Sequence, residues 1–274
     1  MHMDKLTIRN IIKMKNKKKI VAITAYDYPT AKILDSTGVD LILVGDSLGM
    51  VKLGYPSTLQ VTMEEMIIHT KAVCNASPKA VVVTDMPFMS YEVDEKDALI
   101  NASTFMRIGA DAVKIEGGEE YKNVIKRLTN AGIPVMGHIG LTPQKYKQLG
   151  GYRLIGKTYR EAKKVINDAI EVEGAGAFSI VIEYTAYEVA KKITERLSIP
   201  TICIGSGPYC DGQIIVVNDI LGLNDFQPPF ARKYVDLKEV IRKAIINYKS
   251  DVLSGSFPDK YWGMKDGEKS KLEE

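Results

Sequence analysis

The sequence predicts an α/β fold in which eight parallel strands close into a (βα)8 barrel, known as a TIM barrel. Short runs of branched apolar residues recur along the chain and alternate with segments of helical pattern. The runs are apolar throughout, as expected for parallel strands that are buried on both faces. A length of 274 residues suits one barrel or two ordinary domains. Because no linker interrupts the alternation, we expect a single barrel domain over residues 1–274.

The expected strands are rich in Val and Ile, and the eighth is the weakest of them. Between them, Thr62 with Glu65 and Thr158 with Glu161 have the spacing of capping boxes, which predicts two helix starts. Glycines that precede strands predict helix ends at positions 38, 109, 132 and 174. The strands are expected at residues 20–24, 39–44, 80–84, 112–115, 133–137, 178–182, 201–204 and 213–217.

Two segments lie outside this rhythm. Residues 140–157 follow a strand but contain few helix or strand signals, so they form either a cover over an active site or a simple connector. From about residue 251 the chain is polar and lysine-rich, which predicts a loosely ordered tail.

Composition and charge exclude several classes of protein. With 45% hydrophobic and 26% charged residues, the chain is an ordinary globular protein, and no apolar run is long enough to cross a membrane. The net charge of +3 arises largely from lysines near the start, which we interpret as a solvated face because no aromatic residues alternate with them. We therefore expect no nucleic-acid or membrane partner. No signal peptide is recognised, which favours the cytoplasm.

Cysteine usage predicts free thiols. The chain has three cysteines, which is an odd number, and no two of them form a close CxxC pair. They are Cys74, Cys203 and Cys210. This pattern argues against both a disulfide framework and a zinc site built from cysteines.

Acidic residues follow three consecutive strands. Asp46, Asp85 and Glu116 each stand where an apolar run ends, and in a parallel barrel these ends open onto one crevice. Carboxylate oxygens suit a hard cation such as Mg²⁺. Each acid taken alone could instead cap a helix or a turn, but three in succession favour a metal site.

Three further residues complete the expected site. Lys114 lies two residues before Glu116, so both side chains point to the same side of a strand, either toward a substrate carboxylate or as an ion pair. His138 ends another strand and is placed either to bind an anionic substrate or to serve a structural role. Glu183 closes a fourth strand, where partial desolvation suits a general base. The glycine pairs near positions 117 and 206 are interpreted as turns.

A long series of motifs resembles the ketopantoate hydroxymethyltransferase family. The resemblance covers most of residues 20–235. The motifs that carry it are TAYDYPTA from Thr24, ILVGDSLGMVKLGY from Ile42, DMPFMSY from Asp85, GADAVKIEGG from Gly109, GIPVMGHIGLTPQ from Gly132, GGYRLIGKT and CDGQIIVVNDILGL.

The resemblance implies a barrel of the phosphoenolpyruvate/pyruvate type that assembles as a homodecamer. It implies transfer of a hydroxymethyl group from 5,10-methylenetetrahydrofolate to 3-methyl-2-oxobutanoate, the first committed step toward pantothenate and coenzyme A, with one Mg²⁺ per subunit. Family roles fall on the following residues: Asp46, Asp85 and Glu116 as metal ligands, Asp46, Ser47, Asp85, Lys114 and His138 as substrate contacts, and Glu183 as the proton acceptor.

The chain departs from the family pattern at two places. One is IEYTAYEVA, directly after the expected base, and the other is CIGSG, with Cys203 and Ser206 where glycine and alanine are common. Two alternatives to the transferase remain open at this point. A lyase or mutase of the phosphoenolpyruvate type would need a catalytic-loop cysteine motif that has no counterpart here, and a binding module that holds an oxoacid without turnover is supported only by the altered neighbours of Glu183.

Overall fold

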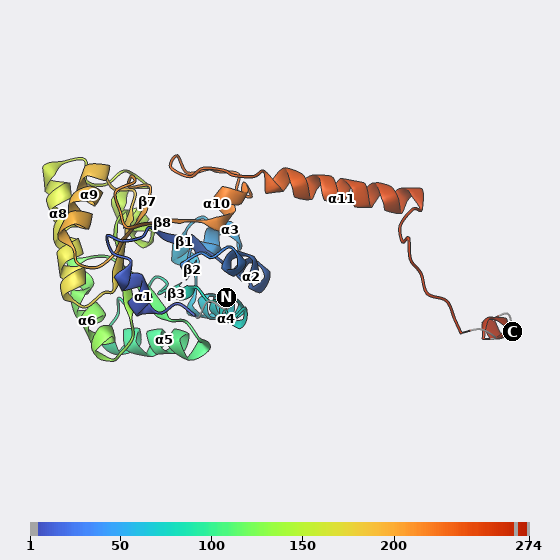
Figure 1. Ribbon diagram of the computed structural model, residues 1–274, viewed down its shortest axis with the longest axis horizontal. Coiled ribbons are helices and arrows are strands. Elements are labelled where there is room, and N and C mark those ends of the chain that lie inside the picture. Colours follow the sequence, from blue (N-terminus) through green and yellow to red (C-terminus); the bar gives the residue numbers. More distant parts are fainter. Residues whose placement is uncertain (1–4, 266–267, 273–274) are drawn as a thin grey trace.

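The computed structural model describes residues 5–265 and 268–272. Its centre is a closed barrel of eight parallel strands in the order β1 to β8, so the predicted fold class is confirmed (Figure 1). The strands are β1 (Ile20–Thr24), β2 (Leu41–Val44), β3 (Val81–Asp85), β4 (Ala112–Glu116), β5 (Val135–Gly140), β6 (Ser179–Glu183), β7 (Thr201–Ile204) and β8 (Gly212–Ile215).

Strand bounds differ from the prediction mainly at the carboxyl ends. The fifth strand begins two residues later than expected and runs on to Gly140, so His138 lies inside it rather than after it. The third, fourth and sixth strands likewise include the acids that were expected to follow them. The pairing of neighbouring backbones continues through these polar residues, because their side chains turn into the barrel mouth while their amides stay in the ladder.

Helices surround the barrel and are capped largely as the sequence predicts. Thr62 and Glu65 form a full capping box, whereas Thr158 caps α8 and Glu161 accepts instead from the Lys157 amide. The helix α8 ends at Gly174 as expected, but the left-handed glycine is Gly176, with φ of 97°, rather than Gly174. The helices are α1 (Ile8–Lys13), α2 (Tyr28–Ser36), α3 (Leu48–Val51), α4 (Met63–Asn75), α5 (Glu95–Ile108), α6 (Lys122–Asn130), α7 (Tyr146–Leu149), α8 (Tyr159–Gly174), α9 (Tyr187–Arg196), α10 (Val217–Leu221) and α11 (Leu237–Ser254), with short 3-10 helices η1 (Thr58–Gln60), η2 (Glu119–Tyr121), η3 (Pro143–Lys145) and η4 (Lys269–Leu272).

The hydrophobic core has two parts. One fills the barrel interior and includes Ile11 of α1, which is fully buried there. The other lies between the strands and the surrounding helices. The lysines near the start are not all a solvated face: Lys15 pairs with Asp211 and Lys18 with Asp40, each at 2.8 Å. Because these buried acids also accept backbone amides of neighbouring strands, the lysines neutralise charges that the fold requires.

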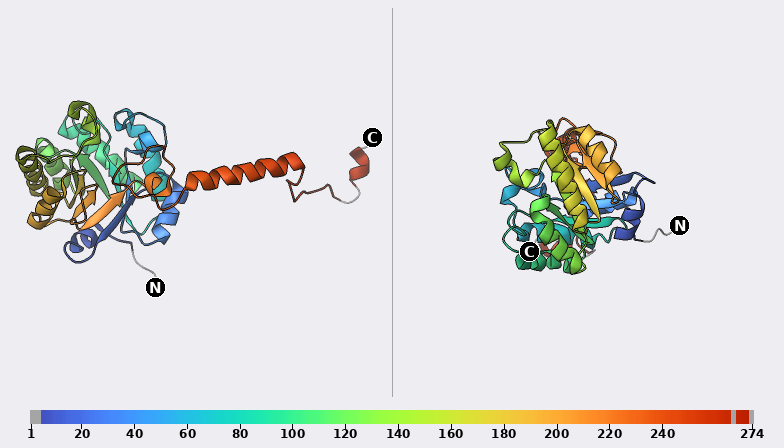
Figure 2. Two further views of the ribbon diagram at one scale, coloured as in Figure 1. Left: turned by 90° about the horizontal axis from the view of Figure 1, so that it is seen from above. Right: turned by 90° about the vertical axis from the view of Figure 1, so that its left-hand side faces the viewer.

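The C-terminal helix leaves the barrel. In Figure 1 and in the left-hand view of Figure 2, α11 projects away from the rest of the molecule, and none of its residues is buried. It continues to Ser254, past the position where the loosely ordered tail was expected to begin. Within the described part of the chain, no helix combines the length and apolar character needed to cross a membrane.

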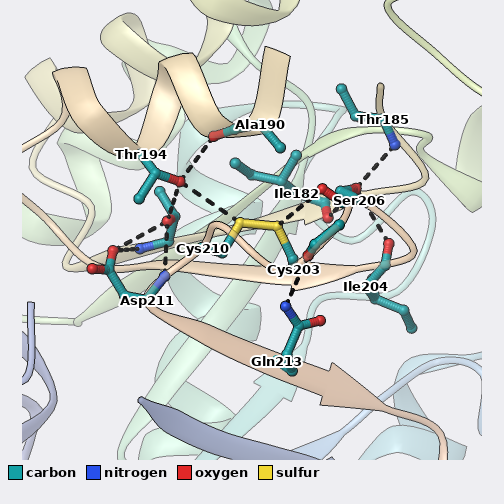
Figure 3. Close-up of a disulfide and its surroundings, with 12 residues drawn as sticks. Ile182, Thr185, Ala190, Thr194, Cys203, Ile204, Ser206, Cys210, Asp211 and Gln213 are labelled. Carbon is teal, nitrogen blue, oxygen red and sulfur yellow. Dashed lines mark hydrogen bonds between the residues drawn. A yellow bond between two sulfur atoms is a disulfide. The ribbon is translucent and has the colours of Figure 1, made fainter. Parts of the chain in front are cut away.

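Two of the three cysteines are joined, so the expectation of three free thiols is wrong. Cys203 on β7 and Cys210 just before β8 form a disulfide beneath α9, and Cys74 remains free (Figure 3). The chain returns from the end of β7 to the start of β8 without a helix. This short return brings the two Cα atoms within 5.8 Å, although the residues stand seven apart in sequence.

Candidate active site

The predicted site residues share one cavity at the carboxyl ends of the strands. Its volume is about 950 Å³. The strand register explains the grouping, because it pairs Asp85 with Lys114 and Glu116 with His138 on neighbouring strands. All seven residues line the cavity: Asp46, Ser47, Asp85, Lys114, Glu116, His138 and Glu183.

Three carboxylates form what we call the acidic cluster, made of Asp46, Asp85 and Glu116. Each is at most 4% exposed. Lys114 lies among them, with its Nζ 2.7 Å from Asp85 Oδ1 and 4.0 Å from Glu116 Oε1. Burial, followed by repulsion from the other two acids, raises the pKa of Asp46 well above its ordinary value. The cluster therefore holds more negative charge than a single lysine offsets.

His138 connects the acidic cluster to the expected base. Its Nδ1 lies 3.2 Å from Glu116 Oε1 and its Nε2 lies 3.1 Å from Glu183 Oε2. Neither nitrogen has a hydrogen-bond partner among the described residues, so we describe these contacts as ion pairs. Although burial and the ammonium of Lys114 disfavour the charged ring, the two glutamates raise the pKa of His138 to about 9. The two carboxylates therefore favour the cationic form of the imidazole, which contacts both of them.

Gln144 was not predicted, yet it ties two members of the acidic cluster together. Its amide nitrogen Nε2 donates to Asp46 Oδ2 at 2.8 Å, and its backbone N–H donates to Glu116 Oε2 at 3.0 Å. Tyr91 in turn donates to the Gln144 side-chain oxygen at 2.8 Å. The only signal in the sequence was the LTPQ segment of the family resemblance, to which no role had been given.

The backbone around Glu183 is fixed by unusual contacts. Tyr184 has a left-handed conformation with φ of 39°, rare for a residue with a side chain. The Thr185 amide donates to Ser206 Oγ at 2.9 Å, and that hydroxyl donates to the Ile182 carbonyl at 2.9 Å. The two segments that depart from the family pattern therefore contact each other. Ser206 of CIGSG accepts a hydrogen bond from the backbone amide of Thr185 in IEYTAYEVA.

Ser47 directly follows Asp46 and lies at the start of α3. Its hydroxyl lies 2.9 Å from the Tyr26 hydroxyl, which fixes its orientation. A side chain at the preceding Gly45 would come within 2.8 Å of Ser47 Oγ and 3.5 Å of Asp85 Oδ2. Glycine at that position allows the Asp46 loop to approach the acidic cluster.

The segment 141–157 forms one wall of the cavity. Pro143 and Tyr152 line the main cavity, while Lys145 and Arg153 line a second cavity of about 570 Å³. Burial, followed by the charge of Glu183, raises the pKa of Tyr152 to about 12. A wall in this position favours the expected cover over a simple connector.

The acidic cluster fits a hard divalent cation in its chemistry. It offers only oxygen donors, and its excess negative charge would be offset by the ion. Among the residues that the structure describes, however, no three acidic, histidine or cysteine side chains are arranged to hold a metal ion directly. Mg²⁺ usually keeps several waters and takes one or two carboxylates. Direct ligation by all three acids stays a prediction.

The fold is shared with enzymes of a known superfamily. The structure resembles a phosphoenolpyruvate phosphomutase from Streptomyces platensis subsp. rosaceus, with a TM-score of 0.62, 12% identity, and coverage of 98% of this chain and 96% of the other. It also resembles a 2,3-dimethylmalate lyase described as a PEP mutase/isocitrate lyase superfamily member, with a TM-score of 0.61, 16% identity, and coverage of 97% and 92%. The chain therefore shares the (βα)8 barrel fold of these enzymes, with an acidic cavity at the carboxyl ends of its strands.

Sequence comparison identifies the family. The model of the ketopantoate hydroxymethyltransferase family matches residues 5–260. A protein from Hyperthermus butylicus named 3-methyl-2-oxobutanoate hydroxymethyltransferase is 60% identical, covering 98% of this chain and 95% of its own length. A relative of the same name from Saccharolobus islandicus is 60% identical, over 94% of this chain and 97% of its length. This chain belongs to the ketopantoate hydroxymethyltransferase family, and the resemblance noted in the sequence is confirmed.

Proposed function

We propose that the protein transfers a hydroxymethyl group from 5,10-methylenetetrahydrofolate to 3-methyl-2-oxobutanoate. The products are 2-dehydropantoate and tetrahydrofolate, with water supplying the hydroxyl oxygen. The name of the relatives supports this oxoacid as the acceptor. The reaction would be the first committed step toward pantothenate and coenzyme A.

The observation that carries the proposal is the chain of contacts from Glu183 through His138 to Glu116. Glu183 keeps 17% of its side chain exposed, toward the cavity, while His138 is buried behind it. The imidazolium holds one oxygen of Glu183 and leaves the other for a substrate proton. In our proposal Glu183 removes the proton from C3 of the oxoacid, and a positioned base contributes roughly 10²- to 10⁴-fold in rate.

The acidic cluster and Lys114 would organise the oxoacid beside that base. Asp46, Asp85 and Glu116 are the residues that would hold Mg²⁺, directly or through water. A bound divalent cation supplies Lewis-acid chemistry by stabilising negative charge on a substrate oxygen. Lys114 and Ser47, which both line the cavity, would contact the anionic end of the substrate and orient C3 toward Glu183.

A deuterium-exchange assay tests the proposal. The protein, Mg²⁺ and 3-methyl-2-oxobutanoate are incubated in D₂O with and without methylenetetrahydrofolate, and C3 deuteration and product are followed by NMR. Exchange without folate, and product with it, are expected. Exchange without product would indicate another electrophile, and absence of both would favour a binding module.

Calorimetric titration of Mg²⁺ tests the cation separately. Asp85→Ala is expected to weaken Mg²⁺ binding, because it removes a carboxylate from the acidic cluster. An affinity equal to that of the wild type would exclude Asp85 as a ligand.

We also propose that the protein assembles with further copies of itself, as the decamer implied by the family resemblance. Two surfaces support self-association. The outer face of the barrel is uncovered at Val21 of β1, which is 53% exposed, and α11 presents apolar residues to solvent, including Ile241 and Ile245. Light scattering is expected to give a mass that is a multiple of 30.4 kDa. A monomer at micromolar concentration would contradict this.

A further inference from the structure

The cavity is larger than a small branched oxoacid requires. Its volume of about 950 Å³ lies near the upper end of the range for sites that enclose drug-sized ligands, about 300–1,000 Å³. The acidic cluster lies at strands β2 to β4, while another part of the lining comes from β8 and the segment 216–230 that follows it. This segment lies beside the end of α3, where Asn218 donates to the Val51 carbonyl at 3.3 Å. This part of the cavity is available to a second ligand.

An acid without a cationic partner lies in this part. Asp219 is 3% exposed and lines the cavity. Its Oδ1 accepts from the side chain of Asn224 at 2.7 Å, and no lysine, arginine or histidine of the described residues lies within ion-pair distance. Burial raises the pKa of Asp219 accordingly. A buried carboxylate with unused acceptor capacity is costly unless a ligand supplies donors.

A second polar group in the cavity also lacks a partner. Thr58 is 2% exposed, lines the same cavity, and its hydroxyl makes no hydrogen bond with the described residues. The surrounding walls are apolar or aromatic, and they include Leu223, Phe226 and Phe230. Phe226 is 74% exposed at the cavity edge. Flat apolar walls with a buried carboxylate suit a planar heterocycle that carries adjacent N–H donors.

We infer that Asp219 binds the pterin ring of the folate co-substrate, accepting hydrogen bonds from its 2-amino group and the adjacent ring N–H. The Thr58 hydroxyl contacts the same ligand, and the residues after α10 cover the ring. The inference rests on the proposed function, because it assigns the part of the cavity that the oxoacid leaves open. Asp219 is a binding residue here and takes no part in removing the C3 proton.

Asp219→Asn separates pterin binding from the oxoacid chemistry. The amide keeps an acceptor for Asn224 but loses the charge and one acceptor for the pterin. We expect the KM for methylenetetrahydrofolate to rise about 10- to 100-fold, with folate-independent C3 exchange within twofold of the wild type. Asp236→Asn is the matched control, since Asp236 is exposed, lies outside the cavity lining and pairs with Lys233. Its KM should be unchanged.

A pair of inhibitors tests the assigned contact directly. Pterin carries the 2-amino donor, whereas lumazine has an oxygen there. The wild type should be inhibited more strongly by pterin, and Asp219→Asn should lose that preference. An unchanged folate KM, an unchanged preference, or loss of C3 exchange in this variant would each overturn the inference. Absence of exchange in the wild type would instead refute the proposed function.

Thr58→Val tests the second contact without relying on the carboxylate. An unpartnered buried hydroxyl contributes nothing to the fold, so the melting temperature should stay equal or rise. The KM for methylenetetrahydrofolate should rise severalfold. If the KM is unchanged, Thr58 is not part of the folate site.

Discussion

Replacing Lys114 with methionine should destabilise the protein strongly in the absence of divalent cations. The side chain is 4% exposed and lies 2.7 Å from Asp85, with Glu116 at 4.0 Å. Methionine fills a similar volume but leaves Asp85 without its cationic partner inside the acidic cluster. Removing one partner of a buried ion pair costs about 3–5 kcal/mol. For a domain of this size, 1 kcal/mol shifts the melting temperature by about 2–4 °C, so we expect a decrease of roughly 6–20 °C.

The assay is thermal unfolding followed by circular dichroism in EDTA, at fixed protein concentration. Lys122→Met is the control, because Lys122 forms an exposed pair with Glu171, and its melting temperature should match the wild type. The decrease for Lys114→Met should be larger at pH 8 than at pH 5.5. The reason is that carboxyls whose folded pKa is raised, such as Asp46, destabilise the fold progressively as pH rises. A melting temperature within 2 °C of the wild type would refute the electrostatic description of the acidic cluster.

Four further predictions concern residues other than the acids at the strand ends. Ser206→Ala should cost about 1–3 kcal/mol, because the buried Thr185 amide loses its acceptor; unchanged urea unfolding would contradict this. Gln144→Ala should slow C3 exchange at least tenfold by freeing Asp46, and a wild-type rate would show that the amide is dispensable. Thiol titration in denaturant should find one thiol without reductant and three after reduction. In the native protein Cys74 should react slowly with iodoacetamide at pH 8, because burial raises its pKa to about 11.

The strand-end residues could be predicted because parallel topology alone brings them together. Three of the acids, Asp85, Glu116 and Glu183, stand at the carboxyl ends of apolar runs. Because the parallel strands close into a barrel, these ends meet at one mouth, and the three side chains line its cavity. Gln144 and Asp219 could not be found in the same way. They reach the cavity from segments beyond the strands, whose path depends on tertiary contacts rather than on a repeating pattern.

The disulfide escaped prediction for a related reason. Spacing rules consider cysteines that are close in sequence or regularly arranged, whereas Cys203 and Cys210 meet only because the chain between β7 and β8 returns without a helix. The detachment of α11 was equally hidden, since its alternation of polar and apolar residues resembles that of a helix packed on its own barrel. Both features depend on tertiary contacts, which the local pattern of residues does not specify.

The central claim is that Glu183 removes the C3 proton from an oxoacid held beside the acidic cluster. The most direct test compares C3 deuteration of 3-methyl-2-oxobutanoate by the wild type and Glu183→Gln, with Mg²⁺ and oxoacid affinities measured in parallel by calorimetry. We predict that the variant binds both normally and that its exchange rate falls by about 10²- to 10⁴-fold. Exchange at the wild-type rate, with binding intact, would contradict the claim.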